Sequence, residues 1–403
     1  MPVYNRRLVL TFGLLTGLFA AGYGVMFTLL DDFRDRYGIS ESSLGLVVSV
    51  GFFAAFAAQV FFAPLADRGH ARRLVNVGMV FNLAGLLMMA FGKTLVVLLL
   101  GRLVMGIGAG IAVPAIRRIV ILADPENLGS NIGRLLAADV GGFAIGPAIS
   151  AVLVRPVGIA APFLVIAAAT LACFPVIARA RVDETSAEDQ PQARFAFDLL
   201  RSRTYVGALL FGSAVFLMVG TFDALWTLVL DDLRTADWIA NLGITLFALP
   251  LIFLGSIGGR LAQRVGPFRV ATFGLLFGAC FMFSYGRLPT GLAMFCVAMV
   301  HALNDGVSVA SSGVAVGVVA PKERMAGAQG LLGGAQTLVG GIAALIAGEL
   351  YQSHGRATAY TVCAVLMATF VGLGIFFVGS AWGARPVADE ETAAALPALA
   401  REG

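Results

Sequence analysis

An imidazole, an amide and a carboxyl group fall within five consecutive residues of an apolar stretch near residue 300. His301 and Asp305 are four residues apart, so in a helix they share one face, and Asn304 lies beside Asp305. A carboxyl group withdrawn from water can exchange a proton near neutral pH, and a neighbouring imidazole can relay it. We therefore predict proton coupling at Asp305 and His301. The alternative is a structural polar cluster that bonds across helices.

Arg102 and Asp139 are charged residues inside two other apolar stretches. A charge at membrane depth is costly and usually faces a cavity or a partner. Arg102 is therefore predicted to hold a carboxylate deprotonated or to sense its protonation. The alternative is an arginine that packs helices and bonds to backbone carbonyls. Asp139 is placed in the same proton-coupling group as a partner of Arg102 or Arg134, or else it only stabilises its part of the protein.

Asp223 has Phe222 and Trp226 close to it in the sequence. A carboxylate beside aromatic faces suits a lipophilic cation, so Asp223 and Trp226 are predicted to bind substrate. The alternative is a carboxylate wetted by an outer vestibule. Tyr23 and Asn304 complete the candidate substrate-binding set.

These residues require elements that cross a membrane. The chain has 403 residues, of which 59% are hydrophobic and 13% are charged, against roughly 45–50% and about 25% in soluble domains. Its mean hydropathy is +0.88. This composition excludes a soluble enzyme, a disordered chain and a disulfide-rich secreted protein. Since a bilayer-spanning helix takes about 20 residues, we predict an all-α membrane protein with twelve transmembrane helices. The predicted spans are 8–30, 44–65, 75–92, 95–116, 132–153, 158–178, 205–230, 240–260, 270–286, 290–319, 327–349 and 358–381.

The sequence lacks the motifs that several other classes of function require. The sequence has no G-x-x-x-x-G-K-[ST] phosphate loop, no H-E-x-x-H and only three histidines. Its four cysteines lie inside apolar stretches and form no metal-type pair. The net charge of +4 comes from arginines in short loops and not from a basic domain. We therefore expect no enzymatic activity, cofactor, metal or nucleic-acid partner.

Charge and repeats organise the chain. Most of the 28 basic residues fall on one side if both termini are cytoplasmic, which predicts a multi-pass protein of the cell membrane with that orientation. Leu30-Asp31-Asp32 recurs as Leu230-Asp231-Asp232. Other short matches follow in order at a nearly constant offset, which indicates two pseudo-symmetric six-helix bundles. The predicted parts are an N-terminal bundle (1–182), a cytoplasmic and solvated linker (183–203), a C-terminal bundle (204–382) and a cytoplasmic tail (383–403).

Three glycine- and arginine-containing motifs punctuate these spans. The loop after the second span reads Ala63-Pro64-Leu65-Ala66-Asp67-Arg68-Gly69-His70-Ala71-Arg72-Arg73, and the fourth span contains Gly101-Arg102-Leu103-Val104-Met105-Gly106. Gly133, Gly142, Gly146 and Pro147 follow the spacing G-x8-G-x3-G-P. A weaker copy of the loop motif has Gln263 where the acid would be. With these motifs the chain resembles the major facilitator superfamily, and specifically its twelve-span drug:proton antiporters.

The resemblance implies a major facilitator fold and a gate built on the loop motif. Asp67 would bind the positive N-terminus of the eleventh span near Ala326 and Gly327, and its pairing would break when the gate opens. The predicted gating residues are Asp67, Arg68, Arg72, Arg73, Gly142, Gly146 and Pro147. The alternative is that the basic loop only sets the topology.

The functional expectation is a proton-coupled secondary transporter that exports small lipophilic or cationic compounds by alternating access. The alternatives are efflux or uptake of a metabolite such as a sugar or an amino acid, a non-transporting membrane sensor or scaffold, and a channel. The expected partners are a small-molecule substrate, protons and membrane lipid, and the expected state is a monomer.

Overall fold

The computed structural model describes residues 3–384, and every regular element in that range is helical. The elements that line up with the predicted first six spans are α1 (Val3–Thr28), α2 (Leu30–Tyr37), α3 (Glu41–Phe62), η1 (Ala63–Arg68), α4 (Ala71–Phe91), α5 (Leu95–Ala123), η2 (Pro125–Asn127), α6 (Leu128–Val157) and α7 (Ala160–Ala178). The remaining elements are η3 (Ala196–Arg201), α8 (Arg203–Asp232), α9 (Asp237–Val265), α10 (Pro267–Tyr285), α11 (Gly291–Ser308), α12 (Ala310–Val319), η4 (Lys322–Arg324), α13 (Met325–Val378) and η5 (Gly379–Gly383).

Eleven helical stretches among the described residues are long and apolar enough to cross a membrane. The last of them, Lys322–Gly383, has 62 residues, whereas one crossing takes about 20. It contains Gly355 with a non-helical backbone (φ 82°, ψ 171°), so α13 consists of two helices. The structure is therefore consistent with the predicted twelve spans. The predicted separation at residues 92–94 is confirmed, because α4 ends at Phe91 and α5 begins at Leu95.

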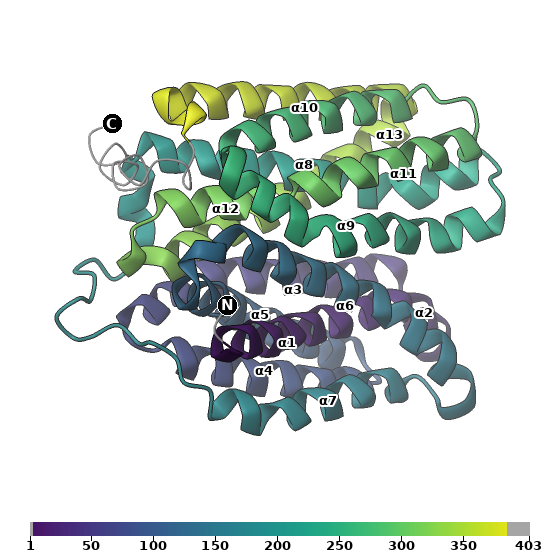
Figure 1. The fold of residues 1–403 in the computed structure, drawn as a ribbon. Helices are drawn as coiled ribbons and strands as arrows, with labels where there is room; N and C mark the ends of the chain where they lie inside the picture. Colours follow the sequence, from purple (N-terminus) through teal and green to yellow (C-terminus); the bar gives the residue numbers. More distant parts are fainter. Residues whose placement is uncertain (1–2, 385–403) are drawn as a thin grey trace. The chain divides into compact units, whose positions relative to one another are not determined.

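Contacts divide the chain into two compact units. The first unit contains Met1–Glu126, Leu135–Ala196 and Lys322–Gly334, and the second contains Asn127–Arg134, Phe197–Pro321 and Ala335–Gly403. Each unit thus includes a short segment from the other half of the sequence. Figure 1 shows each unit as a bundle of long helices. The boundaries predicted at residues 182 and 204 stay predictions.

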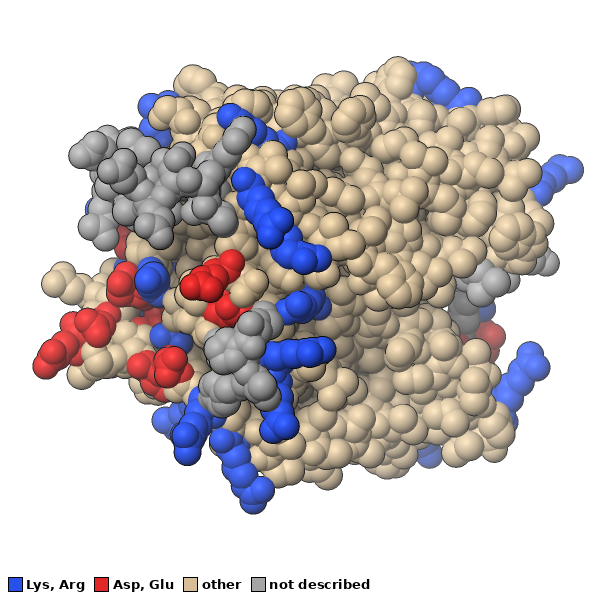
Figure 2. All heavy atoms as spheres, in the orientation of Figure 1, with Lys and Arg blue, Asp and Glu red and all other residues tan. Residues whose placement is uncertain are grey.

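Charged side chains gather at the ends of the helices. In the face shown in Figure 2, blue and red side chains cluster at the ends, and the flanks carry few Lys, Arg, Asp or Glu side chains. Large apolar side chains such as Phe53, Phe253 and Leu345 are 62–74% exposed. Such a surface suits a hydrocarbon environment, where every backbone group must be bonded within its own helix.

Close helix crossings depend on glycine. A Cβ at Gly142 on α6 would collide with the backbone of Gly17 on α1, and a Cβ at Gly146 would meet the backbone of Gly24 and Val25. Lipid supplies no hydrophobic drive between helices, so small residues that allow close backbone contact favour packing. The predicted gating residues Gly142 and Gly146 therefore lie at a tight crossing within the first unit, and their role in gating stays a prediction.

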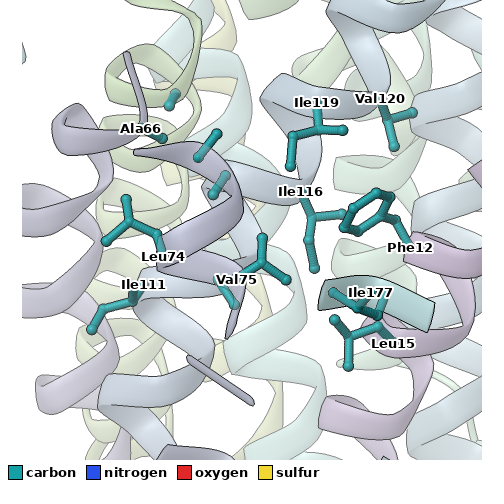
Figure 3. Packing of buried hydrophobic residues seen from close by; sticks show 14 of the residues in the cluster. Phe12, Leu15, Ala66, Leu74, Val75, Ile111, Ile116, Ile119, Val120 and Ile177 are labelled. Carbon is teal, nitrogen blue, oxygen red and sulfur yellow. The ribbon is translucent and has the colours of Figure 1, made fainter. Parts of the chain in front are cut away.

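The core of the first unit surrounds the start of the loop motif. Buried side chains from α1, α4, α5 and α7 meet in one cluster, seen in Figure 3 around Phe12 and Ile116, which both have 0% exposure. The cluster also includes Ala66 and Ala326. Ala66 directly precedes Asp67, and Ala326 lies in the first turn of α13. The core therefore holds both the loop that contains Asp67 and the start of α13.

Candidate functional site

A buried polar chain links α10 and α11 in the second unit. The hydroxyl of Tyr285 lies 2.9 Å from Nδ1 of His301, and Nε2 of His301 lies 3.4 Å from Oδ1 of Asp305. His301 and Asp305 are only 1% and 3% exposed, and Tyr285 is fully buried. The structure thus brings together the two residues predicted for proton coupling and adds a tyrosine on the other side of the imidazole.

Aromatic rings enclose the imidazole. The ring of Phe281 stacks on His301 at 4.8 Å between centroids, and the ring of Phe247 approaches edge-on at 5.8 Å. Asn304 donates one hydrogen bond to the carbonyl of Gly274 at 3.0 Å and another to Oδ1 of Asp305 at 3.3 Å. These contacts hold the carboxylate of Asp305 in a fixed orientation. Asn304, predicted to bind substrate, therefore orients Asp305 in this conformation.

Asp223 and Trp226 point to different surroundings, although both lie on α8. Trp226 has 0% exposure and stacks on Phe222 with 4.8 Å between ring centroids. The side chain of Asp223 is exposed. The two side chains therefore differ in burial in this conformation, because residues three apart on α8 divide between the packed interior and the surface. Their roles in substrate binding stay predictions.

Arg102 lies in an aromatic cage in the first unit. Its guanidinium carbon is 4.0 Å from the centroid of the Tyr23 ring and 5.8 Å from that of Phe52, and the side chain is 5% exposed. A Cβ at Gly51 would collide with the Arg102 side chain, so the glycine makes room for it. Tyr23, predicted to bind substrate, is here the partner of Arg102 through a cation–π contact.

Asp139 has a different partner from the one predicted. The expectation was a pairing with Arg102 or Arg134, but Asp139 interacts electrostatically with Arg117 on α5. Arg134 donates a hydrogen bond to Oδ1 of Asn131 at 3.0 Å. Whether Asp139 takes part in proton coupling or only stabilises its part of the protein stays a prediction.

Asp67 binds the start of α13, where the resemblance implied it would. The backbone N–H groups of Ala326 and Gly327 donate to its two carboxylate oxygens at 2.8 and 2.7 Å. The Nε of Arg118 lies 3.3 Å from Oδ1, and Asp67 has 0% exposure. A carboxylate is favoured at a helix N-terminus, where unbonded N–H groups and the helix dipole both attract negative charge.

The arginines predicted to act with Asp67 lie elsewhere. The side chains of Arg72 and Arg73 are exposed, and Arg68 is half-buried. Arg118, which is 3% exposed, makes the ion pair instead. Sequence reasoning missed Arg118 because it follows Arg117 at the end of a span, where a basic residue is explained by topology alone.

The second unit holds a neutral counterpart of the Asp67 contact. The backbone N–H of Gly129, in the first turn of α6, donates to Oε1 of Gln263 at 2.8 Å. Gln263 lies where the repeat of the loop motif replaces the acid, and it is 8% exposed.

Among the residues described in the structure, no group of three or more His, Cys, Asp or Glu side chains could hold a metal ion.

The model of the major facilitator superfamily matches residues 12–233. An Escherichia coli strain K12 protein named as the uncharacterized transporter YgaY is 25% identical over 287 residues, which cover 68% of this chain and 70% of YgaY. The multidrug resistance protein MdtG of Serratia proteamaculans strain 568 is 26% identical over 252 residues, or 58% of each chain. The solved structure of the proton:xylose symporter XylE superposes with a TM-score of 0.77 at 14% identity and covers 93% of this chain and 96% of XylE.

Proposed function

This chain belongs to the major facilitator superfamily, and we propose that it is a proton-coupled exporter of small lipophilic or cationic compounds that works by alternating access. One relative is named as a transporter and another as a multidrug resistance protein. It is accordingly a multi-pass membrane transporter and not an enzyme. The proposal adds the coupling ion, the direction of transport and the class of substrate.

The buried pair of His301 and Asp305 carries the proposal. The Asp305 carboxylate is 3% exposed at membrane depth, and the His301 imidazole lies 3.4 Å from it. Among the described residues, no arginine or lysine makes an ion pair with it. Its ionised form is therefore only weakly stabilised. Its protonation state can therefore follow the conformation around it. Tyr285 holds Nδ1 of the imidazole, so Nε2 faces Asp305 and the two groups can share one proton.

A proton gradient is sufficient to drive such a carrier. One elementary charge that crosses the membrane releases about 2.3 kcal/mol per 100 mV. For export, proton and substrate would compete, so that protonation of Asp305 from outside releases a bound cation and deprotonation inside restores the site. Arg102 would sense this change in charge, and its cation–π contacts with Tyr23 and Phe52 would change in response.

The proposal includes an orientation. Both termini would be cytoplasmic, because most basic residues then lie on the cytoplasmic side. The loop that contains Asp67 would lie on the same side. The carrier would function as a monomer with membrane lipid around it, and its substrate would be a small molecule.

The test is Asp305→Asn in proteoliposomes that contain a trapped pH dye. Addition of tetraphenylphosphonium or ethidium to wild-type vesicles with an imposed pH gradient should release protons, and the variant should lose this flux by about tenfold or more. Asp35→Asn is the matched control, because Asp35 is exposed and lies outside the predicted spans. Unchanged substrate-induced flux in the Asp305 variant, with normal protein yield, would remove this residue from coupling.

A sugar and an amino acid replace the cations in a second series of vesicles. Flux with a sugar and not with either cation would assign the chain to metabolite transport. Tyr285→Phe keeps the ring and removes the hydroxyl, so it should shift the pH at which flux is half-maximal while leaving the yield of folded protein unchanged.

A further inference from the structure

The chain that leaves α7 is bonded to the first unit. We call residues 183–196 the strap. The two carboxylate oxygens of Glu184 accept hydrogen bonds from the backbone N–H groups of Ala71 and Arg72 at 2.9 and 2.8 Å. These two N–H groups open α4 and have no partner within their own helix. Most strap side chains are exposed, as expected of a solvated linker, but its position is fixed.

Arg118 binds the strap and Asp67 at the same time. Its Nη1 donates to the carbonyl of Asp183 at 3.2 Å, its Nη2 donates to Oγ1 of Thr185 at 2.7 Å, and its Nε faces Asp67 at 3.3 Å. A guanidinium is a rigid planar fork, so its nitrogens turn together. Any rotation that brings Arg118 into a two-point contact with Asp67 must break its bonds to the strap.

A second arginine ties the far end of the strap to the same place. Nη1 of Arg324 donates to the carbonyl of Ala193 at 3.0 Å, and Arg324 also interacts electrostatically with Asp67. Arg324 lies in η4, directly before α13. Movement of the α13 start therefore carries this strap contact with it. Both arginines that hold the strap are thus the cations that surround Asp67.

We propose that the strap is part of the gate at Asp67, so that the α13 start and the strap are released together. In the conformation described here, Asp67 takes its hydrogen bonds from α13, and Arg118 gives its outer nitrogens to the strap. When α13 withdraws, Asp67 loses two donors, and a buried carboxylate needs replacements. Arg118 supplies them by turning its fork toward Asp67, which frees the strap. This inference rests on the alternating access of the proposed function.

Glu184 is the positioning residue of this device. Its hydrogen bonds go to the start of α4, and among the described residues it makes no hydrogen bond or ion pair with Asp67, Arg118 or α13. If it anchors the strap, its loss must be felt at α13 through Arg118. If the strap is only a connection between two bundles, its loss stays local.

Hydrogen–deuterium exchange of the full-length protein in lipid nanodiscs distinguishes these cases. Glu184→Ala should raise exchange in peptides that cover the strap and also at the amides of Ala326 and Gly327, by about threefold or more. The matched control is Glu188→Ala, which removes the same charge from an exposed strap residue. Faster exchange confined to the strap and the start of α4 in Glu184→Ala would overturn the proposal, as would an equal effect at α13 in the control.

A second variant keeps the test valid if the strap simply refolds around residue 184. Arg118→Lys retains the positive charge but cannot hold three acceptors in a plane. It should raise exchange at the strap and at Ala326 together, and an effect at only one of them would contradict the shared release. These measurements need neither substrate nor a pH gradient, so they can succeed or fail independently of the flux assays on Asp305.

Discussion

Asp67 and Gln263 occupy corresponding places in the two halves of the sequence, and both accept a hydrogen bond from the first turn of a helix. The surroundings of the two contacts differ. Asp67 accepts two backbone N–H groups and lies against Arg118, whereas Gln263 is neutral and accepts from Gly129. The two halves therefore keep the same backbone arrangement and differ in charge.

The two loops are also alike in the segment that passes over each of them. Gly69 and Gly266 both have positive φ, at 77° and 117°. A Cβ on the first would lie 3.0 Å from the carbonyl of Thr185, and one on the second 2.8 Å from the carbonyl of Ala384. A segment thus passes closely over each loop. Within residues 3–384, only the first loop binds its segment through an arginine shared with a carboxylate, and the proposed switch between two bonding arrangements therefore belongs to this half.

Among the variants that test this comparison, Asp67→Ala is expected to cause the largest loss of stability. It leaves the buried Arg118 without its carboxylate and two N–H groups of α13 without acceptors. Removal of one partner of a buried ion pair costs about 3–5 kcal/mol. SDS titration of the purified protein in mixed micelles should show a loss of this size. Asp67→Asn keeps one carbonyl oxygen as an acceptor and should fall between the wild type and alanine.

Transport should show the same order. If Asp67 closes the gate, Asp67→Ala should slow ethidium efflux more than any change at Gln263. Equal losses of stability and of transport in Asp67→Ala and Gln263→Ala would mean that the charge adds nothing to the shared architecture, and the comparison between the two loops would fail.

The fold was predictable because hydropathy depends on local sequence. The interruption at residues 92–94 was enough to separate α4 from α5. The kinked pair inside α13 was also predicted as two spans, because the polar residues around Gly355 interrupt the apolar run. The helix ends were less predictable: α1 ends at Thr28 and a separate α2 begins at Leu30, where a single span to residue 30 was expected.

The site was predictable only in part. His301 and Asp305 were found because a spacing of four residues places them on one helix face. Tyr285 was missed because it is on a different helix, and tyrosine in an apolar stretch carries no signal of its own. Glu184 lies more than a hundred residues from the N–H groups that it binds, so only the folded chain reveals its partners.

Gln263→Glu sharpens the comparison by giving the second loop a carboxylate at the place that corresponds to Asp67. The side chain keeps its length, and an ionised carboxylate would gain from the start of α6. The α12 segment that corresponds to the end of α5 contains no basic residue, so α12 offers no counterpart of Arg118. We expect the variant to be less stable by about 1–3 kcal/mol in the same SDS titration, because a charge introduced at a buried position is costly. A variant as stable as the wild type would show that the helix start alone supports the charge, and that Arg118 is dispensable for it.

Gln263→Ala is expected to have the smallest effect of the three. It removes the acceptor for the Gly129 N–H at the start of α6, and a lost helix cap or single neutral hydrogen bond costs about 1 kcal/mol. Gln263→Met is its control, because methionine has a similar length and cannot replace the carbonyl oxygen. If the hydrogen bond is what matters, both variants should lose similar stability and show faster deuterium exchange in peptides that cover residues 128–131. If methionine restores full stability, Gln263 acts through packing, and the likeness between the two loops reduces to their backbone course.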